Sequence, residues 1–100
     1  MSQAKLVFES VREALIEAIE GATGFLHNQS VFEALKSQGI VAFGQVGLDS
    51  LARHEVIATL RKTLGVEISE HELAADETID GLARNIVPRL SRAALRALLP

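Results

Sequence analysis

Ser50 is the residue of this sequence best placed to do chemistry, because its hydroxyl lies where a loop gives way to a helix. It follows the loop residues Val46–Asp49 and opens an apolar-periodic run from Leu51 to Leu64. The first-turn N–H groups of a helix have no partners within the helix, and the macrodipole makes that end positive. Both effects favour an anion attached to Ser50. We therefore expect an exposed hydroxyl on a rigid base, suited to carrying a phosphate.

The elements around this residue predict an all-α bundle of three longer helices with short helices in the connections. The first helix is expected over 3–20, and Gly21 and Gly24 would end it. A capping-box pattern in the long connection over 22–46 predicts a short helix over about 31–37. The inward residues of the first helix are expected to be Val7, Val11, Ala14, Leu15, Ala18 and Ile19. The polar residues, expected mostly on the opposite face, are Glu9, Arg12, Glu13, Glu17 and Glu20.

The helix that begins at Ser50 is predicted to end at Leu64, with Asp49 as its N-cap and Gly65 as its stop. A helical wheel divides it into two faces. The inward residues are Ala52, Val56, Ile57, Leu60 and Leu64. The outward residues are Leu51, His54, Glu55, Ala58, Arg61 and Lys62.

The C-terminal third of the sequence predicts three more short helices. Val66 and Ile68 should enter the core, and a capping box over 69–72 begins a helix that ends near Ala75. Thr78 is expected to cap the next helix, which Pro88 ends; its inward residues are Ile79, Leu82, Ala83 and Ile86. Ser91 would cap a last segment over 92–99, with inward residues Ala93, Leu95, Leu98 and Leu99.

The stretch Gly47-Leu48-Asp49-Ser50-Leu51 opens a helix and is followed by a matching downstream pattern. The residues of that pattern are Glu55, Leu60, Leu64-Gly65-Val66, Ile68, Leu73 and Thr78-Ile79-Asp80. Together they resemble an acyl carrier protein, or phosphopantetheine-attachment (carrier) domain, from about Phe43 to Val87. The resemblance implies a carrier domain over 1–88 and a C-terminal extension over 89–100, which is a docking helix, an added bundle helix or a linker.

What the resemblance implies for Ser50 is modification by a separate phosphopantetheinyl transferase that uses magnesium. That enzyme moves 4′-phosphopantetheine from coenzyme A to the hydroxyl, and the terminal thiol of the arm then holds acyl, aminoacyl or polyketide groups as thioesters. Asp49 lies where the metal and the coenzyme A phosphates approach in this family. The implied partners are the transferase, an acyl- or aminoacyl-loading enzyme, and synthase or tailoring enzymes. The chain itself would be a carrier and no enzyme. For an isolated serine, the alternative is a plain N-cap.

The outward face of the Ser50 helix is expected to meet these partners, through Leu51, His54, Glu55, Ala58, Arg61 and Lys62. His54 stands where carriers generally have an aliphatic residue. Fatty-acid carriers look acidic along this helix, whereas here the helix holds Arg53, Arg61 and Lys62, and acid follows later. We hypothesise dedicated partners with less basic or even acidic docking surfaces. The alternative is that exposed charges merely solvate the surface.

Composition excludes several other classes of function. The 100 residues include no Cys, Trp or Tyr, and the formal net charge is −3. Disulfides and thiolate metal sites are therefore absent, and nucleic-acid binding is not expected. His27, His54 and His71 are far apart in sequence, so no metal site is expected either. No apolar run is long enough to span a bilayer and no secretion signal is present, so no membrane association and a cytoplasmic location are expected.

The sequence favours a specialised pathway of polyketide or nonribosomal-peptide synthesis, because of the unusual charges and the extra C-terminal segment. A housekeeping fatty-acid carrier is the alternative within the class. An unmodified helical adaptor with the carrier fold is the alternative outside it. A hydrolase that uses Ser50 is the third, but the sequence identifies no histidine–acid pair and no glycine-flanked elbow after a strand.

Overall fold

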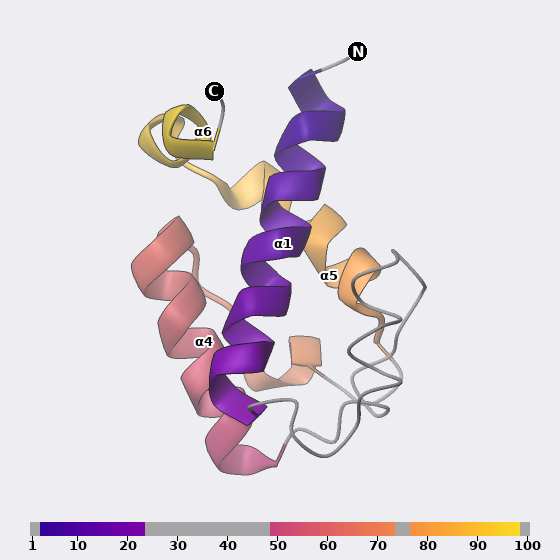
Figure 1. The fold of residues 1–100 in the computed structure, drawn as a ribbon, viewed down its shortest axis with the longest axis vertical. Coiled ribbons are helices and arrows are strands. Elements are labelled where there is room, and N and C mark those ends of the chain that lie inside the picture. The colour runs from indigo at the N-terminus through magenta and orange to yellow at the C-terminus, as the bar shows by residue number, and fades with distance from the viewer. Residues whose placement is uncertain (1–2, 24–48, 74–76, 99–100) are drawn as a thin grey trace.

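Figure 1 shows the computed structural model, which describes residues 3–23, 49–73 and 77–98. Every regular element in those ranges is a helix, which confirms the predicted all-α class. The elements are α1 (Gln3–Thr23), α4 (Ser50–Leu64), the 3₁₀ helix η1 (Glu70–Leu73), α5 (Ile79–Ile86), the 3₁₀ helix η2 (Val87–Arg89) and α6 (Arg92–Leu98). The short helix predicted over 31–37 lies outside the described residues, as do Gly24, Ala75 and Leu99.

α1 is the central helix of the described fold, and it runs antiparallel to α4 (Figure 1). It buries an apolar stripe of residues at helical spacing: Val7, Val11, Leu15, Ile16, Ala18 and Ile19. The predicted end of the helix at Gly21 is wrong, because α1 continues to Thr23. Ala22 packs against the core beyond the glycine. One more apolar contact therefore outweighs the modest helix penalty of a single glycine.

α4 has the bounds that the sequence predicts, and both of its ends are capped as predicted. The Asp49 carboxylate accepts a hydrogen bond from the Ala52 N–H at 2.8 Å. Gly65 has a left-handed φ of 68°, and its N–H donates to the Arg61 carbonyl at 3.0 Å. The inward residues Ala52, Val56, Leu60 and Leu64 are buried, and Ile57 is half-buried against the same core.

α5 completes the core on the other side of α1 (Figure 1). Thr78 caps it as predicted, since its hydroxyl accepts from the Gly81 N–H at 2.9 Å. The four predicted inward residues, Ile79, Leu82, Ala83 and Ile86, are all buried. α5 ends at Ile86 and Pro88 lies in η2 directly after it, as expected of a residue without an N–H.

α6 packs on the bundle as an added helix. Ser91 caps it as predicted, with its hydroxyl accepting from the Ala94 N–H at 3.1 Å. Leu95 and Leu98 pack against the core, and the Ser10 hydroxyl of α1 donates to the Leu98 carbonyl at 3.5 Å. Ala93 is exposed, so its predicted inward position is wrong. The division of the chain at residue 88 stays a prediction.

A buried ion pair joins α1 to α5. The Arg12 guanidinium lies 2.7 Å from the Asp80 carboxylate, and the two side chains are only 9% and 17% exposed. The polar, outward position predicted for Arg12 is therefore wrong. Nearby, the Arg84 guanidinium lies over the Phe8 ring, 5.5 Å from its centroid. These two contacts fix the register of the short helix α5 against α1.

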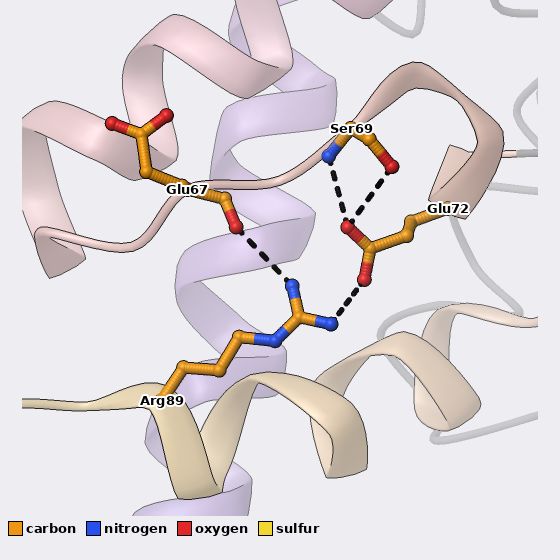
Figure 2. A network of polar contacts seen from close by, with 4 residues as sticks. All are labelled: Glu67, Ser69, Glu72 and Arg89. Atoms are coloured by element: carbon orange, nitrogen blue, oxygen red, sulfur yellow. Dashed lines mark hydrogen bonds and ion pairs between the residues drawn. The ribbon is translucent and has the colours of Figure 1, made fainter.

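A polar network holds the segment after α4 against the end of α5 (Figure 2). The Glu72 carboxylate accepts from the Ser69 N–H at 2.9 Å, which is one half of the predicted capping box. Arg89 of η2 forms an ion pair with the same carboxylate and donates to the Glu67 carbonyl at 3.2 Å. The hydrogen bond from Arg89 is the main cause that lowers the pKa of Glu72, and the bond from the Ser69 N–H adds to it against an opposing effect of burial.

Candidate functional site

Ser50 is exposed and is the first residue of α4. α4 begins at the end of the bundle opposite α6 (Figure 1). The structure assigns the N-cap to Asp49, so the alternative in which Ser50 is itself the plain N-cap is wrong. The Ser50 hydroxyl is therefore not needed to begin the helix, and it projects from a base that a neighbouring residue fixes.

The N-terminus of α4 suits a group that is linked through a phosphate. Asp49 satisfies two donors, because its carboxylate accepts from the Ala52 N–H and its carbonyl accepts from the Arg53 N–H at 2.9 Å. The N–H groups of Ser50 and Leu51 have no acceptor within an α-helix. No acidic residue lies in the first turn of this 15-residue helix, and Asp49 offsets its positive end as the N-cap. The residues present therefore fit a phosphodiester on Ser50.

Arg53 adds a cation one turn after Ser50. Residues three apart are neighbours on a helix surface, and long side chains lean towards the helix N-terminus. The Arg53 Nε atom is buried and has no hydrogen-bond partner in the part of the chain that the structure describes. In the sequence, Arg53 is one of the positive charges of this helix. Its partly buried position separates it from the exposed Arg61 and Lys62.

The outer face of α4 is defined here as Leu51, His54, Glu55, Ala58, Arg61 and Lys62. All six are exposed, as the helical wheel predicts. Leu51 is 69% exposed and is the one large apolar side chain exposed to that degree among the described residues. It follows Ser50 directly, so the face and the hydroxyl form one continuous surface. Contact of this face with partners stays a prediction.

Two ion pairs on the outer face were not predicted from the sequence. His54 Nε2 lies 2.8 Å from the Glu70 carboxylate, and Arg61 Nη2 lies 2.9 Å from the Glu67 carboxylate. The carboxylates come from the segment that follows Gly65, which lies beside α4. For Glu67 the signal in the sequence was its place between apolar Val66 and Ile68, because alternation places the middle side chain outside. The pairing of Glu70 with His54 had no such signal.

The His54–Glu70 contact is also the histidine–acid pair that sequence analysis did not identify. A serine hydrolase needs the histidine to take the proton of the serine hydroxyl. Within the described residues, neither His54 nor Glu70 has a hydrogen bond to Ser50. The pair therefore gives no support to nucleophilic catalysis by Ser50.

Across residues 3–23, 49–73 and 77–98, no cluster of three or more His, Cys, Asp or Glu could hold a metal ion. In the same ranges, no helix has the length and the apolar character that a bilayer crossing requires.

Comparison with known proteins identifies the family of this site. Residues 41–86 match the family model described as the phosphopantetheine attachment site. No curated protein and no solved structure gives a significant match. The match spans just under half of the chain, from before the Ser50 loop to the last residue of α5, and leaves α1 and α6 outside. Residues 41–86 thus belong to the phosphopantetheine-attachment family, as the sequence resemblance predicts.

Membership of this family defines a class of protein. Its members are carriers rather than catalysts, and their cofactor is covalently attached 4′-phosphopantetheine. Residues 41–86 are accordingly similar to a phosphopantetheine carrier domain, of a class that interacts with synthases and modifying enzymes.

Proposed function

We propose that Ser50 is the residue that carries the 4′-phosphopantetheine arm. The observation that carries the proposal is an exposed serine at the N-terminus of α4, capped by Asp49, inside the segment that matches the attachment family. A phosphopantetheinyl transferase performs the step. The Ser50 oxygen attacks the phosphorus that bears pantetheine, the P–O bond of the coenzyme A pyrophosphate breaks, adenosine 3′,5′-bisphosphate leaves, and the hydroxyl proton passes to a base of the transferase.

The chain's own residues position this step. Asp49 holds the first turn through the Ala52 N–H, which fixes the base from which the hydroxyl projects. The first-turn N–H groups and the helix dipole favour the phosphodiester product. Asp49 also lies beside the hydroxyl, where a magnesium ion brought by the transferase and the coenzyme A phosphates would approach. The attached arm supplies a thiol on which intermediates are held as thioesters.

We also propose a pathway and partners for this carrier. Tethering raises the effective concentration of an intermediate at each partner site. We place the carrier in a specialised polyketide or nonribosomal-peptide pathway, served by an acyl- or aminoacyl-loading enzyme and by synthase or tailoring enzymes, in the cytoplasm. The support is the departure of α4 from an acidic helix and the added helix α6. Fatty-acid synthesis is the alternative pathway, and an unmodified adaptor is the alternative function.

Intact mass spectrometry tests the attachment. The purified chain is incubated with coenzyme A, magnesium and a transferase of broad specificity. We expect the mass increment of one phosphopantetheine, and its loss in Ser50→Ala. Ser69→Ala is the matched control, because Ser69 is also exposed, and it should keep the full increment. An increment that persists in Ser50→Ala would overturn the assignment, and no increment with any transferase would favour the adaptor.

A further inference from the structure

We propose that the carboxylates beside the outer face of α4 are engaged by side chains of the same chain, so that this face fits a protein partner whose docking surface is apolar at its centre and has no basic patch. The inference rests on the proposed function and specifies the partner of the same site. It begins from the two ion pairs, His54–Glu70 and Arg61–Glu67, that border this face.

His54 and Arg61 lie along one edge of the outer face. His54 and Arg61 are separated by seven residues, which is close to two helical turns, so they lie nearly above one another. Each has a carboxylate within hydrogen-bond distance, at 2.8 Å for His54 and 2.9 Å for Arg61. The Glu67 carboxylate therefore lies next to a cation of the same chain, and the Glu70 carboxylate lies next to the His54 imidazole.

The segment that supplies these carboxylates is held in place. Val66 and Ile68 are 2% and 5% exposed, so the core fixes the chain on both sides of Glu67. The Glu67 carbonyl also accepts from Arg89, and the Ser69–Glu72–Arg89 network fixes the start of η1 (Figure 2). The pairs thus follow from a packed backbone rather than from a chance meeting of two long side chains.

The remainder of the face is balanced as well. Glu55 and Lys62 are also seven residues apart and carry opposite charges along the other edge. Between the two edges lie Leu51, 69% exposed, and Ala58, which is also exposed. The field of neighbouring opposite charges falls off faster than that of a single charge, so long-range steering by this face is weak. Burial of the apolar centre is then the main source of affinity.

The test is made on the Ser50→Ala chain, in which no arm forms. It measures the affinity of this chain for a fatty-acid condensing enzyme that has a basic docking surface. Calorimetry at low and high salt measures Kd. We expect weak binding that changes little with salt. Adding His54→Gln with Arg61→Gln leaves Glu67 and Glu70 unpaired. This double substitution should tighten binding about tenfold at low salt, and the gain in affinity should disappear at high salt. The opposite pair, Glu67→Gln with Glu70→Gln, should not tighten it.

Arg92→Gln with Arg96→Gln is the matched control, because both arginines are exposed on α6, at the end of the bundle away from Ser50 (Figure 1). It removes two cations and should leave Kd at the parent value. Tight, strongly salt-dependent binding by the parent would overturn the proposal. So would equal tightening by the α6 control, or no tightening when the carboxylates are unpaired. Because these chains cannot be modified at Ser50, the outcome is independent of the mass test of attachment.

Discussion

At the residue scale, Arg12 and Asp80 make the most buried ion pair of the described structure, at 2.7 Å. We expect Asp80→Asn to lower the free energy of unfolding by about 2 kcal/mol, because it removes the negative charge that lies 2.7 Å from the buried Arg12 guanidinium. Glu67→Gln breaks the exposed Arg61 pair, whose side chains are 58% and 77% exposed, and should cost less than about 1 kcal/mol. Urea denaturation of both variants measures the difference; equal effects would contradict a structural role for the buried pair.

The lowered pKa of Glu72 predicts that the stability of the fold depends on pH. Its pKa is lowered in the folded chain, chiefly by the hydrogen bond from Arg89. A lowered folded pKa stabilises the fold above the ordinary glutamate pKa of about 4.3, and this stabilisation disappears as the pH falls through the lowered value. We expect the parent chain to lose more free energy of unfolding than Glu72→Gln between about pH 5 and pH 3. Parallel stability curves for the two chains would refute the contribution.

At the element scale, two glycines should respond to alanine with opposite signs. Gly65 ends α4 with a φ of 68°, and a Cβ there meets nothing within 4 Å, so the cost is purely that of the backbone. We expect Gly65→Ala to destabilise the chain by about 1 kcal/mol. Gly21 lies in the last turns of α1, also with open space around it, and Gly21→Ala should stabilise by about 0.5 kcal/mol. Thermal melts compare the two, and equal shifts would refute this account.

Element bounds were predictable where local chemistry decides them. Asp49, Gly65 and Thr78 each act on backbone groups within four residues, and all three predictions hold in the structure. Burial of Arg12 and the pairing of His54 with Glu70 depend on segments that are distant in sequence. A helical wheel treats every charged residue as solvated, so it placed Arg12 outside and left the charges of α4 unpaired. Ser50 could be proposed as an attachment site because the motif around it is local, and its attachment role stays a prediction.

At the scale of the whole molecule, removal of α6 would show how far the folded unit extends. Leu95 and Leu98 are partly buried against the core, and Ser10 of α1 bonds to the Leu98 carbonyl. We expect a chain that ends at Leu90 to remain helical but to lose roughly 2 kcal/mol of stability, from the apolar area exposed. Circular dichroism and thermal melts measure both properties. A melting temperature equal to that of the full chain would instead identify residues 91–98 as a linker.

The start of α1 and the end of α6 lie at one pole of the bundle, and the start of α4, whose first residue is Ser50, lies at the other (Figure 1). Any tag, bead or neighbouring polypeptide joined through either terminus therefore attaches at the far side from the serine. A molecule immobilised in this way would present the start of α4 outward, and the arm proposed for Ser50 would reach away from the anchor into the surrounding solution.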